Sequence, residues 1–227
     1  MKAILLAAGQ GKRLGAYTNG KPKCLLPLGE DTILSRELKQ LRSVGIVDDD
    51  IYVLGGYRAE LLRPIVPNLI VNPDYDKYEN SYSLGYALEH VPEDDVLILD
   101  TDLCFDESLL EDVIQDEHEN LVLSRKSDDL DESTGIKVDG NGRVLAIGKG
   151  YPHTGYVYMS IFKVGRGAVA DFREALLSEK NIHTWYTPAI TDICQKHMFY
   201  NLVTDKKWHE IDFVEDYLET KKLFGWE

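Results

Sequence analysis

The chain has 227 residues, 44% of them hydrophobic, which is enough to bury the core of one large α/β domain. A formal net charge of −14 argues against binding to nucleic acid or to an anionic membrane surface, and no apolar run is long enough to span a bilayer. Three widely separated cysteines predict neither a zinc site nor a disulfide framework, so we expect a protein of the reducing cytoplasm.

The first half of the chain alternates apolar runs of strand length with helical periods. Lys2–Ala7 is too short for a signal peptide and leads directly into a loop, which favours a buried strand. The apolar spacing then predicts a helix over Asp31–Val44 that ends at Gly45. Further elements are expected as strands at Ile51–Leu54, Leu69–Asn72, Val96–Leu99 and Leu121–Leu123, and as helices from about Ala59, from Asn80, and from Asp106 to about Gln115. This alternation predicts an α/β fold with a Rossmann-like, mixed but mostly parallel sheet and helices on both faces.

From Gly135 the pattern changes to strands separated by turn residues. These strands are expected at Gly135–Val138, Arg143–Ile147 and Gly155–Val164, with a hairpin signal at Asp139-Gly140-Asn141-Gly142. We interpret them as a small β-rich extension of the parallel core. Three helices follow, near Ala168–Leu177, Tyr186–His197 and Val214–Phe224. No repeat or Pro/Gly-rich linker interrupts the chain, so residues 1–227 are expected to form a single domain.

The loop after the first strand concentrates glycine and positive charge. Leu6-Ala7-Ala8-Gly9-Gln10-Gly11-Lys12-Arg13 opens it, and Lys23 follows ten residues after Arg13. Small residues let backbone N–H groups approach a ligand, and three cations on one loop of an acidic chain indicate a polyphosphate site. Two other interpretations compete. A dinucleotide-binding fingerprint requires a third glycine that is misplaced here, and a plain glycine turn with surface lysines requires no ligand.

The two halves of this loop resemble the signature of the sugar-phosphate and phospho-alcohol nucleotidyltransferases. The matching segments are Leu6-Ala7-Ala8-Gly9-x-Gly11-x-Arg13-Leu14 and Pro22-Lys23-Cys24-Leu25. The resemblance implies the nucleotide-diphospho-sugar transferase-like fold. It also implies that Arg13 and Lys23 hold the triphosphate and stabilise charge on the transferring phosphorus. The residues expected to bind the nucleotide through this motif are Leu6, Ala7, Ala8, Gly9 and Gly11.

Two aspartates are expected to bind Mg²⁺ by the same resemblance. Asp102 lies in Asp100-Thr101-Asp102, after the strand Val96–Leu99, at the edge where α/β sheets place ligands. Asp212 lies in Trp208-His209-Glu210-Ile211-Asp212, which resembles the closing motif of the family. A carboxylate pair in a turn is the structural alternative for the first site. A capping box of Asp212 with Glu215 is an additional role for the second.

Other segments suggest how the base and the acceptor are bound. Asn80 and Ser81 lie in a segment that resembles the base-recognition segment of small cytidylyltransferases, although asparagine is also a good helix cap. Lys149 resembles a lysine that contacts the acceptor phosphate in part of the family. The aromatic side chains expected at the acceptor site, either as a cage for a quaternary ammonium or as core residues, are Tyr158, Trp185 and Tyr186.

The activity expected is Mg²⁺-dependent transfer of CMP from CTP to a phosphorylated small alcohol, with release of pyrophosphate. Phosphocholine, aminoethylphosphonate and inositol phosphate all stay open as acceptors. No acidic residue follows the pair Trp185-Tyr186, and Lys149 points away from phosphocholine. The alternatives are a sugar-1-phosphate uridylyl- or thymidylyltransferase, or a non-catalytic nucleotide-sensing domain that would lack Arg13, Lys23 or a metal-binding aspartate. A homodimer also stays open, because the apolar tail Leu223–Trp226 can pack on a partner or on its own core.

Overall fold

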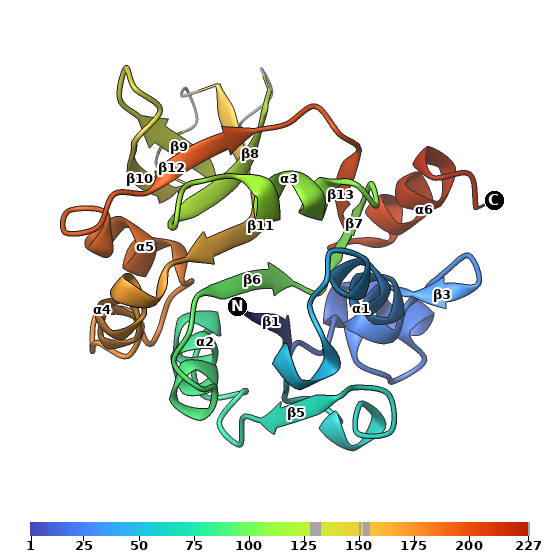
Figure 1. Cartoon of the computed structure of the whole chain (residues 1–227). Helices are drawn as coiled ribbons and strands as arrows, with labels where there is room; N and C mark the ends of the chain where they lie inside the picture. The colour runs from blue at the N-terminus through green and yellow to red at the C-terminus, as the bar shows by residue number, and fades with distance from the viewer. Residues whose placement is uncertain (128–132, 150, 152–154, 227) are drawn as a thin grey trace.

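The computed structural model of the chain describes residues 1–127, 133–149, 151 and 155–226 (Figure 1). Its centre is a mixed sheet of nine strands in the order β10-β9-β11-β6-β1-β4-β5, with β8 pairing to β11 and β12 pairing to β8. The parallel part consists of β1 (Lys2–Ala7), β4 (Ile51–Gly55), β5 (Asn68–Val71) and β6 (Val96–Asp100). Because β1 lies between β4 and β6, the loop at its carboxyl end is flanked by the ends of both neighbours.

Helices cover both faces of this sheet. Successive side chains of a strand point to opposite faces, and in β1 Ile4 packs into one core cluster while Ala3 and Leu5 pack into another. The helices of the first cluster are α2 (Asn80–His90), α4 (Arg166–Leu176) and α5 (Thr187–Ile193), and those of the second are α1 (Ile33–Ser43) and α3 (Leu109–Gln115). The prediction of a mostly parallel, Rossmann-like sheet with helices on both faces is confirmed.

The β-rich extension is attached to the sheet through an antiparallel strand. That strand, β11 (Tyr156–Val164), pairs with β6, and the remaining strands attach to β11 directly or through one another. These are β8 (Leu121–Lys126), β9 (Gly135–Val138), β10 (Val144–Gly148) and β12 (Tyr200–Val203). The predicted hairpin joins β9 to β10, and the Asp139 carboxylate accepts the backbone N–H groups of Asn141 and Arg143 in its turn.

Two short strand pairs were not predicted from the sequence. β7 (Leu103–Phe105) pairs antiparallel with β13 (Trp208–Glu210), and β2 (Pro27–Leu28) pairs with β3 (Asp31–Thr32). Each is too short to show a period of its own, and β7 and β13 come from distant parts of the chain. Short 3₁₀ helices complete the description at η1 (Lys12–Thr18), which is kinked at Gly15, and at η2 (Lys23–Leu25), η3 (Asp48–Asp50) and η4 (Ala59–Leu61).

Several predicted boundaries differ from the structure for identifiable reasons. The strand predicted over Leu69–Asn72 ends at Val71, because the Asn72 side chain accepts the N–H of Asp74 and turns the chain. Asp106 does not cap α3, since its carboxylate accepts the N–H of Lys207. The predicted helix at Tyr186–His197 is shorter, as α5 covers only Thr187–Ile193.

The C-terminal helix α6 (Val214–Leu223) packs on a third, smaller core cluster with η1 and the β2–β3 hairpin. Trp226 lies against this cluster, with the Arg36 guanidinium 4.5 Å from its ring centroid and Phe224 stacked on it at 5.2 Å. The apolar tail therefore packs on its own chain, where Trp226 also lies against Gly29 in the turn between β2 and β3. Among the helices that the structure describes, none is both long and apolar enough to cross a membrane.

Candidate active site

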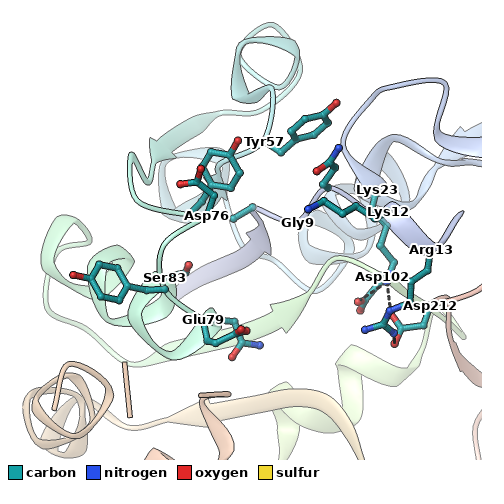
Figure 2. Close-up of a pocket in the computed structure, with 16 residues that line it drawn as sticks. Gly9, Lys12, Arg13, Lys23, Tyr57, Asp76, Glu79, Ser83, Asp102 and Asp212 are labelled. Carbon is teal, nitrogen blue, oxygen red and sulfur yellow. Dashed lines mark hydrogen bonds and ion pairs between the residues drawn. The ribbon is translucent and has the colours of Figure 1, made fainter. Parts of the chain in front are cut away.

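A cleft of about 690 Å³ opens at the carboxyl end of β1 (Figure 2). One wall carries the glycine-rich loop with Lys12, Arg13 and Lys23, together with Asp102 and Asp212. Asp76, Glu79 and Ser83 lie across the cleft from these residues. Four more polar and aromatic residues also line the cleft, namely Tyr57, Tyr75, Tyr78 and Asn80. The cleft thus brings the charged residues predicted from the first loop to one side and the segment that opens α2 to the other.

The loop between β1 and η1 comes close to its neighbours. Gly11 has a φ of 68°, in the left-handed region that favours glycine, and a Cβ there would lie 2.9 Å from the Lys23 Cβ. Gly11 therefore lets the loop lie directly against the catalytic lysine candidate. Ala8, Gly9 and Gly11 all line the cleft.

Leu6 and Ala7 were also predicted to bind the nucleotide, but the structure places them in β1 beneath the cleft. Ala7 is buried, and the Leu6 carbonyl accepts hydrogen bonds from the Thr101 N–H at 3.3 Å and from the Thr101 hydroxyl at 2.6 Å. Neither residue lines the cleft. The difference arises because the strand continues through Ala7 in hydrogen-bonded register with β4, so the loop begins only at Ala8.

Arg13, Lys23, Asp102 and Asp212 meet in one cluster. The Lys23 Nζ lies 2.9 Å from Asp102 Oδ2 and 2.7 Å from Asp212 Oδ1. The Arg13 Nη1 lies 2.9 Å from Asp212 Oδ2, and its guanidinium carbon is 5.1 Å from the ring centroid of Phe213. Four residues from three distant segments of the chain are therefore held in a single network (Figure 2).

Backbone pairing holds the two aspartates side by side. β13 pairs with β7, and beyond their last pair the Ile211 N–H donates to the Asp102 carbonyl at 2.9 Å. The predicted capping box of Asp212 with Glu215 is not formed. Instead Asp216 Oδ2 accepts the backbone N–H groups of Asp212 and Phe213, which leaves the Asp212 carboxylate to the two cations.

The charges in this network shift one another's pKa. Burial lowers the pKa of the Lys23 ammonium, but the charges of Asp102 and Asp212 and their hydrogen bonds outweigh it, so the net pKa is raised. Burial likewise raises the pKa of Asp212, and Lys23 and Arg13 together hold it below its ordinary value. Lys23 therefore carries its positive charge and Asp212 its negative charge at neutral pH.

The two aspartates provide the oxygen donors that Mg²⁺ prefers. Asp102 Oδ1 is buried and has no hydrogen-bond partner in the part of the chain that the structure describes. Within that same part, no group of three or more His, Cys, Asp or Glu side chains is arranged to hold a metal ion. Mg²⁺ is usually bound by only one or two carboxylates together with substrate phosphates and water, so a two-aspartate site fits a metal that arrives with a nucleotide.

The two residues predicted to recognise the base have different surroundings. Asn80 lines the cleft, and its side-chain oxygen accepts the Tyr186 N–H at 3.0 Å. Ser81 is buried, and its hydroxyl donates to the Leu176 carbonyl at 3.0 Å, so it faces α4 rather than the cleft. Ser83 occupies the cleft wall instead, where its hydroxyl accepts a hydrogen bond from Asn72. Asn80 therefore lines the cleft as predicted, whereas Ser83 lines it in place of Ser81.

Of the residues predicted to bind the acceptor, two are buried in the core and two are exposed. Tyr158 and Tyr186 are buried, and their hydroxyls form a chain in which Tyr158 donates to Tyr186 and Tyr186 donates to Asp100 at 2.8 Å. Both rings pack on Phe162 in the core, which explains why they do not form an open aromatic cage. Trp185 is exposed, and the exposed Lys149 holds its ammonium 5.1 Å from the Trp185 ring centroid.

Two further carboxyls lie behind the network: Asp100, the neighbour of Asp102 in the predicted metal-binding turn, and Glu210, for which the sequence predicted no role. Burial, followed by the charge of Asp102, raises the pKa of both Asp100 and Glu210 to about 8. Glu37 on α1 is buried deeper, and neither of its carboxyl oxygens has a partner within the described residues. The sequence did contain a signal for Glu37, because the apolar period of α1 places it on the buried face with Leu34, Leu38 and Leu41.

Known proteins resemble this chain in sequence and in fold. A CTP:phosphoglutamine cytidylyltransferase of Campylobacter jejuni is 26% identical over 249 residues, which cover 95% of this chain and 97% of the relative. A choline-phosphate cytidylyltransferase of Streptococcus pneumoniae is 34% identical over 104 residues, 44% of either protein. The solved structure of the CTP:phosphocholine cytidylyltransferase of Streptococcus pneumoniae has the same fold, with a TM-score of 0.83 at 21% identity and 98% coverage of both chains.

The family called MobA-like NTP transferase domain matches residues 3–183, which is most of the chain. The matched region includes the glycine-rich loop, Lys23 and Asp102, whereas Asp212 lies beyond it. On this match, the protein belongs to the MobA-like NTP transferase domain family and is a nucleotidyltransferase.

Proposed function

We propose that this protein is a cytidylyltransferase that transfers CMP from CTP to a phosphorylated small molecule, requires Mg²⁺ and releases pyrophosphate. The observation that carries the proposal is the network of Lys23 and Arg13 with Asp102 and Asp212 on one wall of an open cleft. Two cations beside a glycine-rich loop suit a triphosphate, and two carboxylates suit its metal. Residues 1–227 would act as one domain in this reaction.

The transfer requires alignment and charge rather than a proton acceptor. An oxygen of the acceptor phosphate forms a bond to the α-phosphorus, and the bond from that phosphorus to the oxygen bridging to the β-phosphate breaks, so pyrophosphate leaves. Lys23 and Arg13 would stabilise the negative charge on the phosphoryl oxygens and on the leaving group. Backbone N–H groups of Ala8–Gly11 would orient the nucleotide. Asp102 and Asp212 would hold Mg²⁺, which when bound supplies positive charge to the phosphates of both substrates.

The choice of CTP is supported by the relatives and by the second wall of the cleft. Relatives over nearly the whole chain and over part of it are both named as CTP-using enzymes. Tyr75, Asn80 and Ser83 line the cleft with a ring, an amide and a hydroxyl, which are suitable groups to contact a pyrimidine. The competing assignment is UTP or dTTP with a sugar 1-phosphate.

The surroundings of Trp185 argue against an acceptor with a quaternary ammonium. An aromatic cage needs ring faces that are free to accept a cation. Here the Lys149 ammonium already lies over Trp185, and Tyr158 and Tyr186 are buried. Trp185 lies next to the cleft, because hydrogen bonds tie both of its chain neighbours to the start of α2. The Tyr186 N–H donates to the Asn80 side chain, and the Thr184 carbonyl accepts the Ser81 N–H. We therefore place phosphoglutamine, an acceptor with a carboxylate, ahead of phosphocholine in the proposal.

A single panel of assays tests the proposal. The whole chain is incubated with Mg²⁺ and each NTP against phosphoglutamine, phosphocholine, aminoethylphosphonate, inositol phosphate and glucose 1-phosphate, and pyrophosphate release is followed. We expect release with CTP and one acceptor, lost in Lys23→Ala and kept in Lys21→Ala, an exposed lysine of the same loop that does not line the cleft. Release with UTP or dTTP and the sugar phosphate would overturn the CTP assignment. CTP binding without any release would favour a nucleotide-sensing domain.

A further inference from the structure

Three of the four carboxylate oxygens of Asp102 and Asp212 are already bonded to cations of the chain itself. Lys23 takes one oxygen from each aspartate, and Arg13 takes the second oxygen of Asp212. The fourth oxygen, Asp102 Oδ1, is buried and has no partner among the described residues. The aspartates that suit a divalent cation are thus almost fully occupied by an ammonium and a guanidinium.

These bonds and a bridging metal exclude one another. Mg²⁺ requires close oxygen ligands in a near-ideal octahedral arrangement. One free carboxylate oxygen cannot bridge the two aspartates, so a metal held by both must take an oxygen from Lys23 or Arg13. A divalent ion at those oxygens would also lie close to the Lys23 ammonium, where two like charges repel strongly in a partly buried site.

We propose that Lys23 and a divalent cation exchange places at the Asp102–Asp212 pair, so that the metal enters the site together with the triphosphate rather than before it. Lys23 then leaves the carboxylates for the phosphates, and Arg13 follows it. This inference rests on the proposed function, because the exchange needs an anionic substrate to receive the two side chains.

The positions of the side chains allow the exchange without movement of the fold. Lys23 and Arg13 both line the cleft beside the glycine-rich loop, and a lysine side chain can turn about four flexible bonds. The Lys23 side chain is only 13% exposed, so its departure would leave carboxylates uncompensated unless another cation took its place. Metal and nucleotide are therefore expected to bind with positive coupling.

The test measures Mn²⁺ binding to the whole chain without nucleotide, from the electron paramagnetic resonance signal of the free ion. Lys23→Met is expected to bind Mn²⁺ about tenfold more tightly than the wild type, because no ammonium competes for the two oxygens. Arg13→Ala is expected to bind about threefold more tightly, since it frees one exposed oxygen. The matched control is Lys12→Met, which removes a charge from the same cleft wall but has no ion pair within the described chain, and it should stay within about twofold of the wild type. Asp102→Asn should abolish binding.

Thermal unfolding gives a second readout if Lys23→Met is poorly folded. That variant leaves two carboxylates without their shared cation, so Mn²⁺ should raise its unfolding temperature more than that of the wild type. If it does not fold even with Mn²⁺, Arg13→Ala carries the test, because the Arg13 side chain is 54% exposed and its loss should leave the fold intact.

The outcomes separate the exchange from the proposed function. If Lys23→Met and Arg13→Ala bind Mn²⁺ no more tightly than Lys12→Met, while Asp102→Asn abolishes binding, the exchange is wrong and the metal site stands. If neither the wild type nor Lys23→Met binds Mn²⁺, the metal assignment of the proposed function is overturned together with the exchange.

Discussion

Two groups of carboxyls lie around the carboxyl end of β6, and their surroundings differ. Asp102 and Asp212 face the cleft, where Lys23 and Arg13 pair with them. Asp100, Glu210 and Glu37 lie behind them, and none of the three has an ion pair within the described residues. Both groups lie close enough to affect one another, since burial and then the charge of Asp102 raise the pKa of all three acids behind it.

Lys23 and Arg13 thus pair with the two acids that face the cleft and not with the larger group of three acids behind it. The acids behind the cleft respond to burial by holding protons, and the pKa of Asp100 and of Glu210 rises to about 8. Burial acts on Asp212 in the same direction, but the charges of Lys23 and Arg13 hold its pKa below the ordinary value. A site that keeps charged oxygens at its surface can exchange one cation for another, whereas a protonated carboxyl cannot.

The largest expected effect is on catalysis, where the acids that face the cleft should matter more than the acids behind them. Asp102→Asn is expected to lower kcat/KM by about a hundredfold or more, because it removes a charged oxygen donor at the transferring phosphate. Asp100→Asn is expected to cost about tenfold or less, since an amide oxygen can still accept the bond from the Tyr186 hydroxyl. Pyrophosphate release with CTP and the active acceptor measures both. Equal losses would show that Asp100 also faces the substrates.

Among the acids behind the cleft, Glu37 is expected to lower the stability of the fold. Glu37→Met is expected to raise the free energy of unfolding by about 1–3 kcal/mol, because it removes a buried carboxyl without hydrogen bonds and keeps an apolar side chain of similar length. The matched control is Gln40→Met, one turn further along α1. Its amide donates to the Phe105 carbonyl at 3.1 Å, so this variant should be destabilised by about 1–2 kcal/mol. Urea unfolding of both variants decides, and loss of stability in Glu37→Met would contradict the prediction.

The protonated acids also predict a dependence of stability on pH. Glu210 has a pKa of about 8 in the folded protein, above its ordinary 4.5, so between these values the native state holds a proton that the unfolded chain has released. This contribution is fully present below pH 4.5 and is lost as the pH rises to about 8. Glu210→Gln should therefore gain stability relative to the wild type between pH 5 and pH 8, by about 1 kcal/mol or more. Urea unfolding across this range, with the exposed Glu89→Gln as control, measures it. A difference that does not grow with pH would show that Glu210 is ionised in the fold.

The sequence predicted the parallel core well, because β1 and β6 are continuous apolar runs and α1 shows a clear helical period. It could not predict β7 and β13, which have three residues each and pair across about half of the chain. That missed pairing is what places Asp212 beside Asp102. Lys23 lies 79 residues from Asp102 and 189 from Asp212, so only the resemblance to a known motif suggested that they meet.

The sequence also could not predict which side chains face the core and which face the cleft. Tyrosine suits both a core and a binding site, and packing on Phe162 placed Tyr158 and Tyr186 in the core. Ser81 and Ser83 are two positions apart on α2, which turns them to different sides of the helix. The contact of Ser81 with Leu176 on α4 decides which of them reaches the cleft, and that contact spans 95 residues.

The smallest expected effect concerns how Arg13 is held in the cleft. Its guanidinium contacts both Asp212 and the exposed ring of Phe213, so Phe213 would position Arg13 without touching the substrate. A cation–π contact at an exposed site contributes about 0.5–1 kcal/mol, and Phe213→Leu should therefore lower kcat/KM by about two- to fivefold. The same substitution made in Arg13→Ala should have no further effect, because its partner is already gone. If Phe213→Leu costs as much in Arg13→Ala as in the wild type, Phe213 acts on the reaction through another residue, and the double-mutant cycle would locate it outside this ion-pair network.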